Sequence, residues 1–141
     1  MKYKLTILIL LSWYSFFLIQ KINLTTADLG RHIKNGEMVL SGNFDVLRTN
    51  FYSYTNSTFP INNHHWLSGV IFFLIYKFFG FSGAHLFFII LSLLTFCIFF
   101  YVSERESGSA TAGILSFLII PLIAKRTEVR PEVFSYLFAG V

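Results

Sequence analysis

An aspartate and a histidine one helical turn apart are the first residues in this sequence that could do chemistry. Asp28 and His32 are spaced i,i+4, so on a helix they share a face. A carboxylate beside an imidazole can act as a general base or hold a cation. The same spacing fits a helix cap at Asp28 with a solvated His32, and both interpretations stay open.

A second polar group is the pair of adjacent histidines, His64 and His65, directly before Trp66. Neighbouring side chains on a helix point in different directions, so these two rarely bind one metal together. With His32 and Asp28 they could form a site, but no metal-ligand spacing requires it, and a divalent cation is left open. Histidines facing water and lipid headgroups beside an interfacial Trp66 are the alternative.

A third group is the compact charged stretch 125–132. Its basic residues are Lys125, Arg126 and Arg130, and its acidic residues are Glu128 and Glu132. Arginine side chains match the oxygens of a phosphate, so Arg126 and Arg130 are candidate ligands for an anion. A signal that sets membrane topology is the alternative role of the same charges.

The composition indicates what kind of elements position these groups. The chain has 141 residues, of which 55% are hydrophobic and 13% charged, whereas soluble domains carry about 25% charged residues. So few charges cannot cover a surface that faces water, and the basic residues form no stripe for a nucleic acid. The composition therefore favours an all-α, multispan integral membrane protein over a soluble enzyme, a nucleic-acid binder or a disordered tail.

Apolar runs predict the membrane segments of a single membrane domain over 1–141. The predicted spans lie at about 5–20, 84–102 and 110–124. The run 66–79 is short for a span and predicts a juxtamembrane helix, with a break at the glycines and serine of 80–83. Pro131 is expected as the first residue of a last apolar helix.

The polar stretch 22–65 is the long loop of this domain. A loop of that length is usually functional. Within it we expect a helix from Asp28 to about Gly36, a turn at 41–43 and a second turn near 56–60. Lysines before the first apolar run favour a cytoplasmic N-terminus, which puts this loop outside.

These residues, in this order, resemble the front end of the membrane-embedded glycosyltransferases of the C superfamily. That group includes protein mannosyltransferases, aminoarabinose transferases and oligosaccharyltransferases, and the likeness is greatest to bacterial members with uncharacterised acceptors. The matching positions are Asp28, His32, Gly36, the stretch Asn-Phe-Tyr-Ser-Tyr-Thr at 50–55, His-His-Trp-Leu at 64–67 and Arg-Pro-Glu at 130–132. Asn50 stands where the family commonly has an aspartate.

The resemblance implies transfer of a sugar from a lipid-linked polyprenyl-phosphate donor to an acceptor at the outer face of the bacterial plasma membrane. It implies Asp28 as the residue that activates the acceptor. It also implies a second acidic residue in the catalytic set, for which Glu128 or Glu132 is the nearest match and Glu128 is taken here. The implied substrate-binding residues are His32, His64, His65, Arg126, Arg130 and Glu132. Because the likeness covers only the front of such an enzyme, we expect a longer protein, or a partner membrane subunit, to supply the remainder.

This scheme makes a demand on topology. Asp28 and Glu128 can share a site only on one side of the membrane, which requires that 66–79 does not span. The length of that run favours this arrangement, whereas a basic stretch 125–132 on the outside runs against the usual charge bias. The runner-up function is a non-catalytic small multispan membrane protein or partner subunit that uses the loop for binding. A transporter fits less well, because no charged residue lies in the middle of an apolar run.

Overall fold

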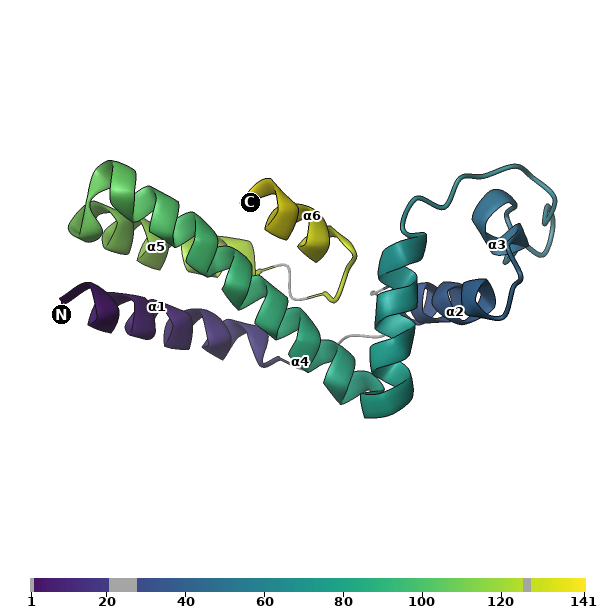
Figure 1. Cartoon of the computed structure of the whole chain (residues 1–141), viewed down its shortest axis with the longest axis horizontal. Helices are drawn as coiled ribbons and strands as arrows, with labels where there is room; N and C mark the ends of the chain where they lie inside the picture. Colours follow the sequence, from purple (N-terminus) through teal and green to yellow (C-terminus); the bar gives the residue numbers. More distant parts are fainter. Residues whose placement is uncertain (1, 21–27, 126–127) are drawn as a thin grey trace. The chain divides into compact units, whose positions relative to one another are not determined.

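The computed structural model describes residues 2–20, 28–125 and 128–141, and consists of helices joined by turns and one long loop (Figure 1). Within these ranges no strand forms, and an isolated bridge pairs Thr49 with Pro60. The expected all-α class is therefore confirmed. The helices are α1 (Lys2–Leu18), α2 (Leu29–Leu40), α3 (Asp45–Arg48), α4 (Trp66–Ser107), α5 (Ser109–Ala124) and α6 (Glu132–Ala139).

The longest helix, α4, is interrupted at Gly80. This residue has φ +66° and ψ −164°, a backbone conformation that is essentially restricted to glycine. The first half of α4 therefore ends at Phe79, and the second half begins at Phe81. The predicted break between a short helix over 66–79 and the following apolar run is confirmed.

Helices α1, α5 and α6 and the second half of α4 from Leu86 onward form one compact unit, here called the bundle unit. It contains the described residues within 1–23, 86–128 and 132–141. Aromatic rings connect the four helices to one another. The ring centroids lie 5.3 Å apart for Trp13 and Phe117, 5.6 Å for Tyr14 and Phe96, and 6.1 Å for Phe87 and Phe134.

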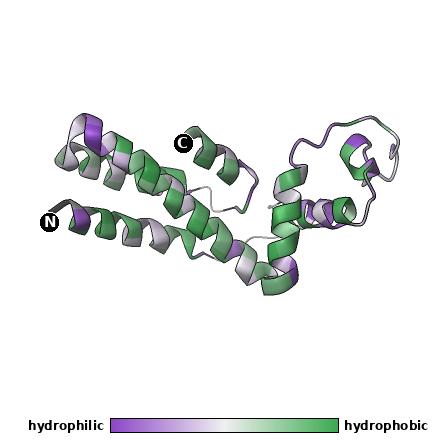
Figure 2. Cartoon of the chain, in the orientation of Figure 1, coloured by the Kyte–Doolittle hydropathy of each residue, from purple (hydrophilic) through white to green (hydrophobic). Residues whose placement is uncertain are grey.

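The outer surface of the bundle unit is apolar. Hydrophobic colour runs along α1, α5 and the second half of α4 in Figure 2, and Phe16, Leu122 and Phe138 are each at least 70% exposed. By length and composition α4 could cross a membrane, while α1 and α5 are apolar but shorter, within the described part of the chain. These features are compatible with association with a membrane.

The second compact unit, here called the loop unit, contains the described residues within 24–85 and 129–131. It holds α2, α3, the long loop and the first half of α4. Helix α2 ends in a glycine cap, in which Gly42 has φ +83° and the chain reverses direction. The backbone N–H groups of Gly42 and Asn43 donate to the carbonyls of Val39 and Met38, at 3.1 and 2.9 Å. The turn predicted at 41–43 is confirmed.

Several helix boundaries differ from the predictions. The second half of α4 continues to Ser107, beyond the apolar run 84–102. Helix α2 continues to Leu40 rather than ending near Gly36, because Gly36 serves a contact with another helix and the cap lies at Gly42. Helix α6 begins at Glu132, one residue after the predicted start at Pro131.

After α3, the long loop is closed at its base. The N–H of Asn50 donates to the carbonyl of Phe59 at 2.8 Å, and the N–H of Ile61 donates to the carbonyl of Arg48 at 2.9 Å. The turn predicted near 56–60 forms at residues 57 and 58. The loop between these bonds is therefore a defined structure that leads directly into α4.

Candidate functional site

Helix α2 carries Asp28 and His32 one turn apart, as their spacing predicted. Asp28 occupies the N-cap position, and its backbone carbonyl accepts a hydrogen bond from the N–H of His32 at 3.0 Å. Its side chain makes no capping bond and instead lies 3.3 Å from the guanidinium of Arg31. Asp28 is exposed, whereas His32 is 5% exposed on the packed face of the helix. Asp28 thus remains accessible, and His32 faces the interior of the loop unit.

Two glycines allow α2 and the first half of α4 to touch backbone to backbone. A Cβ on Gly36 would overlap the carbonyl oxygen of Gly69, and a Cβ on Gly69 would lie 2.8 Å from the carbonyl oxygen of His32. Both residues are buried. No larger side chain fits between the helices at this crossing, so Gly36 is needed there for its small size.

The glycine crossing brings together two histidines that are distant in sequence. His32 lies one turn before Gly36, and His65 lies one turn before Gly69, whose N–H donates to the His65 carbonyl at 3.0 Å. The His32 and His65 ring centroids are consequently 5.8 Å apart, with the rings nearly perpendicular. The ring of His64 lies 4.0 Å from that of His65. The separate motifs around residues 32 and 65 therefore form one imidazole cluster.

The charged stretch near the end of the described chain divides between the two units. Arg130 falls in the loop unit, together with Asp28 and the three histidines, and its neighbours Val129 and Pro131 are buried. Glu128 and Glu132 fall in the bundle unit. Arg126 lies outside the described residues.

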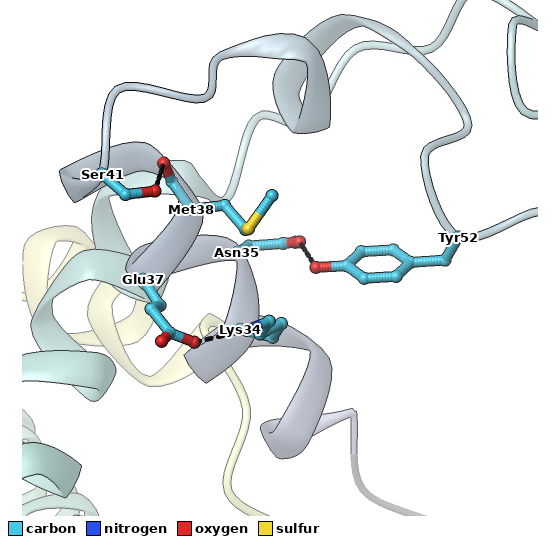
Figure 3. A network of polar contacts seen from close by, with 6 residues as sticks. All are labelled: Lys34, Asn35, Glu37, Met38, Ser41 and Tyr52. Carbon is cyan, nitrogen blue, oxygen red and sulfur yellow. Dashed lines mark hydrogen bonds and ion pairs between the residues drawn. The ribbon is translucent and has the colours of Figure 1, made fainter.

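A hydrogen bond that the sequence interpretation missed connects the long loop to α2. The hydroxyl of Tyr52 donates to Oδ1 of Asn35 at 2.7 Å, and Asn35 is 5% exposed (Figure 3). Beside it, Lys34 and Glu37 form an exposed ion pair at 2.7 Å. Burial raises the pKa of the Tyr52 phenol, an effect opposed by the positive charges of Lys34 and Arg31. The sequence signal for this bond is the amide of Asn35 on the packed face of α2. Because buried amides are usually hydrogen-bonded, Asn35 could have indicated a polar partner.

The divalent cation left open by the sequence has no assembled binding site in the described ranges. There, no three side chains of the His, Cys, Asp and Glu types gather closely enough to hold a metal ion.

No family model, curated protein or solved structure matches this chain. The chemistry of the site therefore has to be argued from its residues. The loop unit combines an accessible carboxylate at Asp28, a cluster of imidazoles and the guanidinium of Arg130. A carboxylate can accept a proton, and cationic or N–H-donating groups can hold an anion.

Proposed function

We propose that the chain is part of a membrane-embedded glycosyltransferase that takes a sugar from a polyprenyl-phosphate donor. The observation that supports this is that Asp28, the imidazole cluster and Arg130 belong to one compact unit. Those residues come from three separate parts of the sequence, and each falls in a motif of the resemblance to the C superfamily. Membership of one compact unit is compatible with a common site for base and phosphate ligand.

In this proposal Asp28 is the general base. The acceptor hydroxyl gives its proton to the Asp28 carboxylate as its oxygen forms a bond to the anomeric carbon of the donor sugar. The bond between that carbon and the polyprenyl phosphate oxygen breaks, and polyprenyl phosphate leaves as an anion. Arg130, together with the N–H groups of His64 and His65, stabilises the charge that develops on the leaving phosphate.

The remaining predicted residues have supporting roles in the proposal. Glu128, Arg126 and Glu132 keep the roles that the resemblance implies, with Glu128 as a second acidic residue and Arg126 and Glu132 as substrate-binding residues. The reaction takes place at the outer face of a bacterial plasma membrane, with the N-terminus cytoplasmic and spans at about 5–20, 84–102 and 110–124. The chain works with the remainder of the enzyme or with a partner membrane subunit.

A transfer assay with a matched pair of aspartate variants tests the proposal. The chain, together with the remainder of the enzyme or its partner membrane subunit, is reconstituted in vesicles with a panel of polyprenyl-phosphate sugars, and release of polyprenyl phosphate is measured. We expect Asp28→Asn to lower the rate by about 100-fold or more, the usual contribution of a general base. Asp45→Asn is the control, because Asp45 is also an exposed acid of the loop unit but lies in α3. Equal rates for the two variants would argue against a base at Asp28.

Donor binding gives a second measurement that does not depend on turnover. A photoreactive polyprenyl phosphate should crosslink to the full chain, and Arg130→Gln should weaken the crosslink while Asp28→Asn leaves it intact. If the chain neither binds nor turns over the donor, the non-catalytic membrane protein becomes the better interpretation. The ion pair between Asp28 and Arg31 favours that alternative, since an exposed pair at a helix start is an ordinary structural feature.

A further inference from the structure

The long loop contains a stretch without any charged side chain. From Thr49 to His65 the sequence has no Asp, Glu, Lys or Arg, and it is rich in Asn, Ser, Thr and aromatic residues. A stretch of this length in a soluble domain would carry about four charges. The stretch nevertheless belongs to the polar part of the chain, outside the long apolar runs. We call residues 49–65 the aromatic loop.

Large apolar and aromatic side chains of the aromatic loop are exposed. Tyr54 is fully exposed, and Phe59 and Ile61 are 54% and 42% exposed. Trp66, the first residue of α4, continues this surface at 44% exposure. Isolated exposed apolar residues are ordinary, but several within one short uncharged segment indicate a surface that contacts something other than water.

The side chains of the aromatic loop are exposed even though its backbone is folded and held by hydrogen bonds. Backbone hydrogen bonds close the base of the loop, and a further bond from the N–H of Asn63 to the carbonyl of Leu47, at 2.9 Å, extends the closure. Tyr52 fixes the loop to α2 through the buried amide of Asn35. The fixed backbone of the loop therefore presents Tyr54 and Phe59 to the outside. Tyr52 is itself 48% exposed, but its hydroxyl points to Asn35 (Figure 3).

We propose that the aromatic loop lies in the headgroup layer of a bilayer, with Tyr54 and Phe59 inserted among uncharged lipid headgroups. Tyrosine and tryptophan are enriched at this depth, where one end of the ring is in apolar surroundings and the other in water. A segment without charges avoids the cost of removing ions from water. The loop also leads without interruption into Trp66 and the apolar helix α4.

The absence of Lys and Arg in the loop decides which lipid surface fits. Recognition of anionic lipid relies on basic side chains near the headgroups, and this stretch has none. The proposal therefore commits to a zwitterionic surface, with contacts that depend on aromatic burial rather than on charge. It does not depend on the proposed transferase activity.

A spin-label depth measurement on the full chain tests the proposal. In a Cys97→Ser background, a nitroxide is attached at Tyr54→Cys and, as a matched control, at Ser41→Cys, an exposed position of the loop unit after α2. The protein is placed in phosphatidylcholine vesicles. Collisions with oxygen, which concentrates in lipid, are compared with collisions with a water-soluble nickel complex. We expect position 54 to favour oxygen severalfold relative to position 41, with no change as salt is raised.

A second variant separates the contribution of the loop from that of the label. When Phe51→Ser and Phe59→Ser are added, the nitroxide at position 54 should collide with the nickel complex more often, approaching the collision rate of position 41. Equal accessibility at positions 54 and 41 in the parent loop would overturn the proposal. Protection of position 54 from nickel only after a neutral oligosaccharide is added would also overturn it, and would assign the loop to carbohydrate.

Discussion

Tyr52 and Asn35 show how a single hydrogen bond can hold the long loop against α2. Asn35 is 5% exposed, and a buried amide oxygen without a donor costs about 1–3 kcal/mol. The phenol of Tyr52 supplies that donor at 2.7 Å, and its ring packs edge-on against Phe51 with centroids 5.3 Å apart. The position of the loop thus depends on a phenol and an amide that meet across the loop unit.

We expect Tyr52→Phe to lower the free energy of unfolding by about 1–3 kcal/mol, because Oδ1 of Asn35 stays buried and loses its donor. Tyr54→Phe is the matched control, since Tyr54 is fully exposed and its hydroxyl can be replaced by water. Thermal unfolding of the full chain in detergent, followed by circular dichroism, measures both. Melting temperatures that shift equally in the two variants would contradict the bond.

The same phenol predicts a pH dependence of stability. Burial raises the pKa of Tyr52 above its ordinary value of 10.0 in the folded chain. Above pH 10.0 the unfolded chain therefore loses this proton first, and the folded state becomes less favoured as the pH rises. The stabilisation is fully present below pH 10.0 and is lost between that value and the folded pKa. The free energy of unfolding, measured as a function of pH, should fall less steeply with rising pH in Tyr52→Phe than in Tyr54→Phe. Identical slopes would exclude Tyr52 as the titrating group.

At the scale of elements, the crossing of α2 and α4 determines which polar groups meet. Because the helix backbones touch at Gly36 and Gly69, the residues one turn earlier, His32 and His65, lie side by side. If the two helices were farther apart, the rings of His32 and His65 would no longer be in contact, although neither histidine had been changed. The two glycines are therefore positioning residues for the imidazole cluster.

Gly36→Ala should separate the helices and destabilise the loop unit by about 1–3 kcal/mol, as overpacking does. Gly30→Ala is the control on the same helix, because a Cβ at Gly30 would have nothing within 4 Å, and alanine is the better helix former by about 0.5–1 kcal/mol. Unfolding midpoints compare the stabilities. Histidine ring resonances in NMR spectra should shift in Gly36→Ala and stay in place in Gly30→Ala; unchanged resonances in both would show that the crossing does not position the cluster.

The sequence predicted helix locations better than it predicted helix contacts. The apolar runs gave α5 and the break in α4 at Gly80, because length and glycine act locally. The end of α2 was wrong, since Gly36 resembles a helix end in isolation and its partner Gly69 is distant in the chain. The spacing of Asp28 and His32 predicted correctly that they lie one turn apart at the start of α2. The bond between Asn35 and Tyr52 was not predicted, because it depends on tertiary contact and has no local pattern.

At the scale of the whole molecule, the proposed function depends on membrane topology. The described chain has one helix, α4, that is long and apolar enough to cross a bilayer, and shorter apolar helices α1 and α5. The break at Gly80 leaves the first half of α4 too short for an ordinary span. If that half lies along the surface, Asp28 and Glu128 face the same side.

We expect single cysteines at Asp28 and Glu128, placed in separate chains with Cys97→Ser, both to react with an impermeant maleimide added to intact cells. Cysteines at Lys34, an exposed position of α2, and at Ser107, the last residue of α4, serve as references for the expected outer and inner faces. Labelling of position 28 without labelling of position 128 would place the acidic residues on opposite sides and would rule out a shared site.

The uncharged stretch of the loop also makes the chain unevenly sensitive to proteases. Trypsin has no cleavage site between Arg48 and Lys77. It therefore releases the aromatic loop and most of the first half of α4 as one peptide. Chymotrypsin instead meets Phe51, Tyr54 and Phe59 on exposed side chains. Trypsin therefore reports whether the ends of this segment are open to water, and chymotrypsin reports whether the loop itself is covered.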